Sequence, residues 1–205
     1  MLIGLGLGPG DPGLLTLRAV QILESADVVY VPGRVAASLV APWRQAEILE
    51  FPMTDDESTI RISLERNADR IASEVRSDGG DRLVVLGILG DPNFYSTFSR
   101  LCAVLDERHP GIARRTEPGV SAITAFASVA GVNLQDGFAV TDGGEPSDRV
   151  LLKVRRPREA AERLRLEGFA ELVLVERMFM EGTQVYRDGE FPEESDYFSV
   201  LFARR

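Results

Sequence analysis

Short apolar runs without polar alternation are the feature that most limits how this chain can fold. They occupy residues 2–7, 27–31, 82–86 and 172–175. Continuous apolar runs of this length are typical of strands that are buried on both faces of a sheet. Helical patterns lie between them, with Thr16 as a predicted N-cap, apolar residues at helical spacing over 59–75, and Pro157 opening a later helix. This alternation predicts an α/β fold.

The second half of the chain has a different rhythm from the first. One clear helix, which starts at Pro157, lies among four predicted strands at 138–141, 150–154, 172–175 and 197–202. Turn residues and a short strand over 111–118 precede a small, helix-compatible segment. We therefore predict two unequal α/β lobes, 1–117 and 118–205, with a cleft between them.

Composition and charge exclude several classes of partner. A net charge of −9 and an isoelectric point near 4.8 argue against nucleic acid, because binding to it depends on neutralising phosphates. The sequence contains no apolar run long enough to span a bilayer and no signal peptide, so we expect a cytoplasmic protein without a membrane partner. One cysteine and one histidine cannot form a Cys/His cluster, so we expect no protein-bound metal.

The loop after the first apolar run has the spacing of a dinucleotide-binding turn. Residues 8–13, Gly-Pro-Gly-Asp-Pro-Gly, match G-x-G-x-x-G formally. Two prolines remove amide donors from this loop, and the acidic residue expected about 20 positions later is absent. The glycines still allow positive φ angles and a close approach of a ligand to the backbone. A small-molecule loop and a plain strand-to-helix turn both stay open at this point.

Two more loops follow predicted strands with similar chemistry. Residues 87–92 are Gly-Ile-Leu-Gly-Asp-Pro, followed by Asn-Phe-Tyr-Ser-Thr, and residues 117–122 are Glu-Pro-Gly-Val-Ser-Ala. Open α/β sheets bind ligands beyond the carboxyl ends of their strands. Each loop alone is a weak signal, since tight turns often use the same residues. Three such loops that converge on one cleft predict a small-molecule site.

These segments resemble the tetrapyrrole (class III) S-adenosylmethionine-dependent methyltransferases. The resemblance runs through the whole chain, from GLGPGDPGLLTLRAVQILESADVVYVPGR through LGDPNFYSTFSRL and EPGVSAITAFASVAG to VLLKV. Within the family, the second and last of these segments look most like the branch that methylates carbon 20 of precorrin-2 or its cobalt form in cobalamin biosynthesis. The resemblance implies the two-lobed tetrapyrrole methylase fold, S-adenosylmethionine as co-substrate, a tetrapyrrole substrate and a homodimer.

The resemblance also implies which residues contact the cofactor. In the family, the cofactor lies folded in the cleft between the lobes, and the tetrapyrrole occupies an open trough nearby. Carried over position by position, the cofactor contacts are Gly8, Pro9, Gly10, Leu89, Gly90, Asp91, Phe94, Ser96, Thr97, Ser121, Ala122, Leu152, Lys153 and Met178. Gly13 stands where relatives often carry glutamate, a departure that bears on the substrate contacts.

The implied chemistry needs alignment more than a covalent intermediate. An electron-rich carbon attacks a sulfonium methyl in line, and proximity with orientation can supply about 7–11 kcal/mol. Asp91 and Tyr95 are the nearest polar candidates for a base that accepts the released proton. The substrate carries several carboxylates, so the candidates to bind it are Arg18, Arg34, Arg44 and Arg100. A solvated surface arginine is the alternative for each.

Other functions stay open at the level of the sequence. The same fold and cofactor could serve another corrin carbon, a diphthamide precursor or a ribosomal RNA ribose, although the acidic balance disfavours RNA. A nucleotide-dependent oxidoreductase has only the formal glycine motif in its favour. A cofactor-binding module without catalysis would keep all three loops, since a fold does not determine a function.

Overall fold

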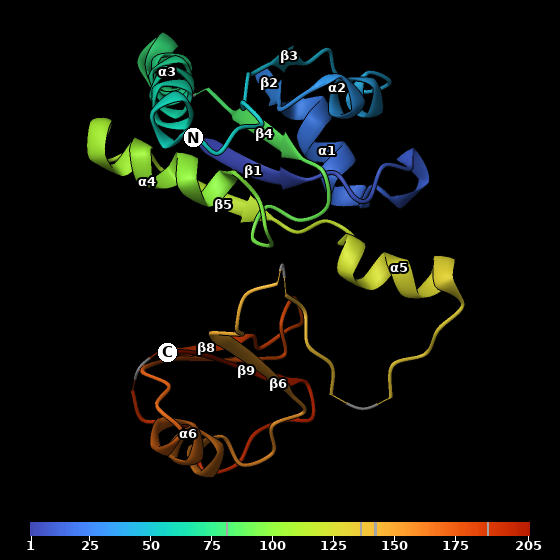
Figure 1. The fold of residues 1–205 in the computed structure, drawn as a ribbon, viewed down its shortest axis with the longest axis vertical. Coiled ribbons are helices and arrows are strands. Elements are labelled where there is room, and N and C mark those ends of the chain that lie inside the picture. The colour runs from blue at the N-terminus through green and yellow to red at the C-terminus, as the bar shows by residue number, and fades with distance from the viewer. Residues whose placement is uncertain (81, 136, 142, 188) are drawn as a thin grey trace. The chain divides into compact units, whose positions relative to one another are not determined.

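The protein divides into two compact units. A computed structural model describes residues 1–80, 82–135, 137–141, 143–187 and 189–205 (Figure 1). The units are Met1–Gln135 and Asp136–Arg205. Helix α5 (Ala122–Ala130) therefore groups with the first unit, whereas the division predicted at 117/118 assigns it to the second lobe. Within the described residues, every helix is too short or too polar to cross a membrane.

The first unit is built on a parallel, five-stranded sheet. In spatial order its strands are β3 (Glu47–Ile48), β2 (Val28–Val31), β4 (Val84–Ile88), β1 (Leu2–Gly6) and β5 (Arg114–Glu117). β1 and β4 are buried along their whole length, as their continuous apolar runs predict. The chain crosses from β1 to β2 in one direction and from β4 to β5 in the other. The neighbouring strands β4 and β1 therefore lie where the strand order reverses direction, and open α/β sheets bind ligands at that point.

Helices cover both faces of this sheet (Figure 1). One face carries α1 (Leu17–Ser25) and α2 (Arg34–Val40), and the other carries α3 (Glu57–Arg76) and α4 (Phe98–Arg108). Thr16 caps α1 as predicted, because its hydroxyl accepts a hydrogen bond from the Ala19 amide at 3.0 Å. Two short 3₁₀ helices, η1 (Pro12–Leu14) and η2 (Ser77–Gly80), complete the unit.

Residues of β1 alternate between the two faces of the sheet, with Ile3 and Leu5 on one face and Leu2, Gly4 and Gly6 on the other. Ile3, Leu5 and Leu7 join the core beneath α1 and α2. Gly4 faces α4, where a Cβ would lie only 2.6 Å from the Phe98 ring. The absence of a side chain at Gly4 therefore lets the first residue of α4 pack directly on the sheet.

The second unit contains a four-stranded antiparallel sheet. In spatial order its strands are β6 (Asp148–Leu152), β9 (Ser199–Arg204), β7 (Glu171–Glu176) and β8 (Gln184–Arg187), and α6 (Pro157–Leu166) packs on one face. The strand predicted at 138–141 is wrong, since the described residues 137–141 form none. An apolar run forms a strand only if a neighbouring strand pairs with its backbone. β3, β8 and α2 were not predicted from the sequence, and the other predicted strands and helices are confirmed.

Removing the space that Gly4 provides should destabilise the first unit. We expect Gly4→Ala to lower the free energy of unfolding by about 1–3 kcal/mol, because the new methyl group overlaps the Phe98 ring. Urea denaturation followed by circular dichroism measures this change. In a Phe98→Leu background, the same substitution should cost less. An equal cost in both backgrounds would contradict the packing explanation.

Charge pairs around Asp69 join α3 to α4. The Asp69 carboxylate accepts hydrogen bonds from Arg108 Nε at 3.0 Å and Nη2 at 2.8 Å, and lies 2.6 Å from His109 Nε2. These hydrogen bonds, those of Arg108 first, lower the pKa of Asp69 from 3.8 to about 2. Because the folded pKa is depressed, the charged carboxylate stabilises the fold above its unfolded pKa. This contribution is lost as the pH falls toward 2.

We expect Asp69→Asn to remove part of the acid sensitivity of the fold. The free energy of unfolding of both proteins would be measured from about pH 5 to about pH 2. The wild type should lose its advantage over the variant across this range, and the advantage should be small because the pair is partly exposed to solvent. A difference that stays constant with pH would show that Asp69 does not act through its charge.

Candidate active site

Three loops meet at the carboxyl edge of the parallel sheet. They are residues 7–16 after β1, residues 89–97 after β4 and residues 118–121 after β5, here called the first, second and third loop. β4, β1 and β5 are adjacent and parallel, so the three loops leave the sheet side by side (Figure 1). The predicted convergence of these loops is found within the first unit.

Backbone contacts join the loops and leave no room for side chains. Gly90 N donates to Gly8 O at 2.7 Å, and Gly8 N donates to Gly90 O at 3.3 Å. A Cβ on Gly119 would lie 2.4 Å from Gly90 O, and a Cβ on Gly6 would lie 2.3 Å from Gly119 N. Glycine is therefore required at Gly6 and Gly119 for the backbones of the three loops to touch.

Asp91 links the second loop to the third. Its side chain is buried, with Oδ1 accepting from the Asn93 amide at 2.9 Å and Oδ2 accepting from the Gly119 amide at 3.1 Å. Backbone amides thus occupy both carboxylate oxygens. This arrangement makes Asp91 an organiser of the two loops.

The second loop folds back on itself before α4 begins. Ser96 Oγ donates to the Pro92 carbonyl at 2.5 Å and accepts from Phe98 N at 3.2 Å. Tyr95 has a φ of 49°, in the left-handed region that non-glycine residues seldom adopt. Leu89, Phe94 and Tyr95 are 40%, 54% and 66% exposed. The loop therefore presents apolar and aromatic surface beside its glycine.

Most of the predicted cofactor residues lie on or directly after these loops. They are Gly8, Pro9, Gly10, Leu89, Gly90, Asp91, Phe94, Ser96, Thr97, Ser121 and Ala122. Gly10 and Gly90 have φ angles of 122° and 74°, and no atom lies within 4 Å of where a Cβ would be. Ser121 caps α5, with Oγ accepting from the Ile123 amide at 3.2 Å. The loops therefore offer an open, glycine-lined surface to a small ligand.

The remaining predicted cofactor residues, Leu152, Lys153 and Met178, lie at one edge of the sheet in the second unit. β6 and β7 both run antiparallel to β9, so they end at the same edge. Lys153 has a φ of 58°, and its amide donates to Ser199 O at 2.8 Å. Its Nζ lies 5.1 Å from the centre of the Tyr197 ring. The structure thus gathers these three residues at one sheet edge within their own unit.

The four arginines predicted to bind substrate lie in different places. Arg18 of α1 donates to Glu117, the buried last residue of β5, at 3.2 Å. Arg34 is exposed at the start of α2. Arg100 lies in the first turn of α4, next to the second loop. Arg44 donates to a backbone carbonyl just before β2, at the opposite end of the sheet from the loops. The structure therefore separates Arg44 from the candidate site.

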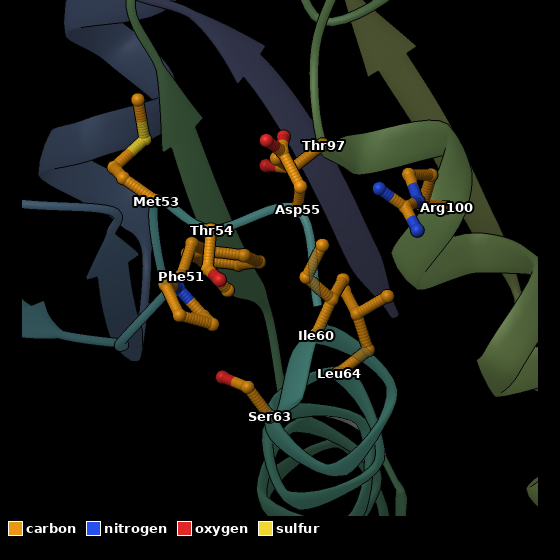
Figure 2. Close-up of a pocket in the computed structure, with 10 residues that line it drawn as sticks. Phe51, Met53, Thr54, Asp55, Ile60, Ser63, Leu64, Thr97 and Arg100 are labelled. Atoms are coloured by element: carbon orange, nitrogen blue, oxygen red, sulfur yellow. The ribbon is translucent and has the colours of Figure 1, made fainter. Parts of the chain in front are cut away.

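Sequence reasoning missed a hollow beside the second loop. It has a volume of about 420 Å³ and opens between the segment after β3, α3 and the start of α4 (Figure 2). Phe51 lines it together with Ile60 and Leu64, and Thr97 and Arg100 lie on the α4 side. The segment that lines the hollow follows β3, and β3 is too short and too polar to be recognised as a strand in the sequence.

Known proteins with similar sequences cover nearly the whole chain. Residues 1–187 match the family described as Tetrapyrrole (Corrin/Porphyrin) Methylases. A Methanocaldococcus jannaschii protein named "Probable cobalt-precorrin-2 C(20)-methyltransferase" is 26% identical, and the match covers 98% of this chain and 95% of that protein. A Sinorhizobium protein named "Precorrin-2 C(20)-methyltransferase" is 29% identical, with 98% and 93% covered.

Solved structures share the fold. Uroporphyrin-III-C-methyltransferase from Thermus thermophilus is 25% identical, with a TM-score of 0.51 over 99% of this chain and 91% of that one. A Corynebacterium diphtheriae protein described as "putative cobalamin synthesis related protein (CobF)" has a TM-score of 0.55 over 100% and 98% of the two chains, at 15% identity, which shows the fold alone. These matches confirm the predicted fold and the predicted methyltransferase activity. This chain belongs to the tetrapyrrole (corrin/porphyrin) methylase family.

Proposed function

We propose that this protein transfers a methyl group from S-adenosylmethionine to carbon 20 of precorrin-2 or cobalt-precorrin-2 in cobalamin biosynthesis. The observation that carries the proposal is the near full-length similarity to two proteins named for that reaction. The three joined loops at the carboxyl edge support it, because this is where an α/β sheet of this order binds a small ligand.

The loop residues fit S-adenosylmethionine. Gly10 and Gly90 keep the backbone open to a ligand, and the exposed Leu89 and Phe94 offer apolar contact to a purine and to the carbons around a sulfonium. When bound, S-adenosylmethionine supplies a methyl group that an electron-rich ring carbon attacks in line. The protein's own contribution is to hold the reactants in line and to exclude water, an effect that can reach about 7–11 kcal/mol.

The two candidate bases differ in their surroundings. Asp91 is buried and bonded to two amides, so we assign it to holding the loops in place. Tyr95 is exposed on the second loop and stays the candidate to accept the proton that the ring carbon releases. Leu152, Lys153 and Met178 stay proposed cofactor contacts on the strength of the family resemblance.

We also propose a cytoplasmic homodimer that uses neither nucleic acid nor a membrane as partner and holds no metal through its own side chains. Across the described residues, no group of three or more His, Cys, Asp or Glu side chains is placed to bind a metal ion. Any cobalt in the reaction therefore belongs to the substrate in this proposal.

Methyl transfer to defined substrates tests the proposed function. The purified protein would be incubated without oxygen with labelled S-adenosylmethionine and either precorrin-2 or its cobalt complex. We expect one methyl group to be added, measured by mass spectrometry, and NMR to locate it at carbon 20. Methylation of a different carbon would reassign the enzyme within the family. Binding of S-adenosylmethionine without transfer to either compound would contradict the substrate assignment.

Weakening the Asp91 link should impair cofactor binding more than the chemistry. Asp91→Asn keeps one acceptor oxygen and loses the other, which leaves an amide without a partner at a cost of about 1–3 kcal/mol. We expect the Kd for S-adenosylmethionine to rise about tenfold by calorimetry, and the pH profile of kcat to keep its shape. Asp27→Asn is the matched control, because Asp27 accepts from the Leu83 amide at the opposite end of the sheet. An unchanged Kd together with loss of the acidic limb of the pH profile would make Asp91 a base instead.

A further inference from the structure

We propose that the hollow beside α4 receives one acid-bearing pyrrole ring of the tetrapyrrole, with the acid arm on Arg100. We further infer that Glu57 occupies the position of that acid arm on Arg100 until the substrate binds. The inference rests on the proposed function and deepens it, since it identifies a subsite that selects the substrate. All of its residues lie in the first unit.

The size and walls of the hollow fit one ring with a side chain. Its volume of about 420 Å³ lies toward the small end of ligand pockets, below what a complete tetrapyrrole needs. Phe51, Ile60 and Leu64 provide an apolar wall against which a flat ring can pack. Thr97, the last residue of the second loop, lines the other side, so the hollow adjoins the candidate cofactor loops.

Arg100 has the chemistry to bind a carboxylate and is held by one already. Its Nη2 lies 2.7 Å from Glu57 Oε2, and the two side chains are 48% and 77% exposed. Ion pairs this exposed contribute little free energy. A substrate carboxylate can therefore displace Glu57 at low cost, and it gains the contact of its own ring with the apolar wall. Arg100 is therefore paired with a carboxylate both before and after the substrate binds.

The acidic residues beside Glu57 have other tasks. Asp56 caps α3 and accepts hydrogen bonds from the amides and hydroxyls of Ser58 and Thr59. These hydrogen bonds, that of the Thr59 hydroxyl first, hold the pKa of Asp56 below its ordinary value.

Asp55 lines the hollow, and Figure 2 shows it on the same side as Thr97 and Arg100. A carboxylate accepts hydrogen bonds only, so it complements the N–H of a pyrrole. The lining therefore combines an acceptor for the ring nitrogen, a cation for the acid arm and an apolar wall for the ring face.

A single pyrrole tests the subsite without the methyl transfer reaction. Porphobilinogen, one pyrrole ring with an acetate arm, a propionate arm and an aminomethyl group, would be titrated into the full-length protein and followed by NMR. We expect shifts at the Thr97 amide and the Arg100 side chain. Binding should weaken at least tenfold in Arg100→Gln and tighten up to about fivefold in Glu57→Gln, which removes the competing carboxylate. Absence of shifts in the wild type and in Glu57→Gln, or equal binding in all three proteins, would overturn the inference.

Kinetics on the proposed substrate separate this inference from the proposed function. Arg100→Gln should raise KM for precorrin-2 or its cobalt complex about tenfold and leave the Kd for S-adenosylmethionine unchanged, whereas Glu57→Gln should lower KM. Asp106→Asn is the matched control, because Asp106 pairs with Arg114 at 2.6 Å at the far end of α4. Normal wild-type transfer with an unchanged KM in Arg100→Gln would refute the subsite alone. Absence of transfer with retained porphobilinogen binding at Arg100 would refute the substrate assignment alone.

Discussion

The contact between glycine backbones at the carboxyl edge of the parallel sheet is the constraint on which the candidate site depends. Gly6, Gly90 and Gly119 lie so close that a side chain on Gly6 or Gly119 would overlap a neighbouring loop. The loops after β1, β4 and β5 therefore leave the sheet together, and Asp91 becomes buried where both of its oxygens meet amides. Loops that a ligand must order lose binding free energy to conformational entropy. Here the packing orders them in advance.

The fold could be predicted where one local cause dominates. β1 and β4 are buried on both faces, so burial leaves a continuous apolar run in the sequence. The start of α1 is set by the hydrogen bond from the Ala19 amide to the Thr16 hydroxyl, two groups only three residues apart. β3 and β8 are exposed along most of their length and carry no apolar pattern, and the run at 138–141 has the pattern but forms no strand. Strand pairing is a long-range property, so these elements could not be read locally.

The candidate site was predictable as a set of loops but not as a set of contacts. Glycine and proline after apolar runs identify loops at strand ends, because few other residues turn so tightly. The end of the sheet at which a residue lies depends on topology. For this reason Arg44 and Arg100 were treated alike, although the structure places Arg44 at the amino end of β2 and Arg100 beside the second loop. The partner of Arg18, Glu117, lies 99 positions away in the chain, and no spacing rule connects them.

One segment of the chain carries both halves of the proposed chemistry. Residues 89–100 begin with the second loop, which Asp91 fixes to the third, and end at Arg100 beside the hollow. Within this segment, Phe98 packs on β1 at Gly4. Any side chain at position 4 would force the Phe98 ring to shift. Methyl transfer in line depends on the distance and angle between donor and acceptor more than on any reactive side chain. Under the proposed function, a cofactor loop and a substrate pocket built from the same anchored segment would keep that distance constant.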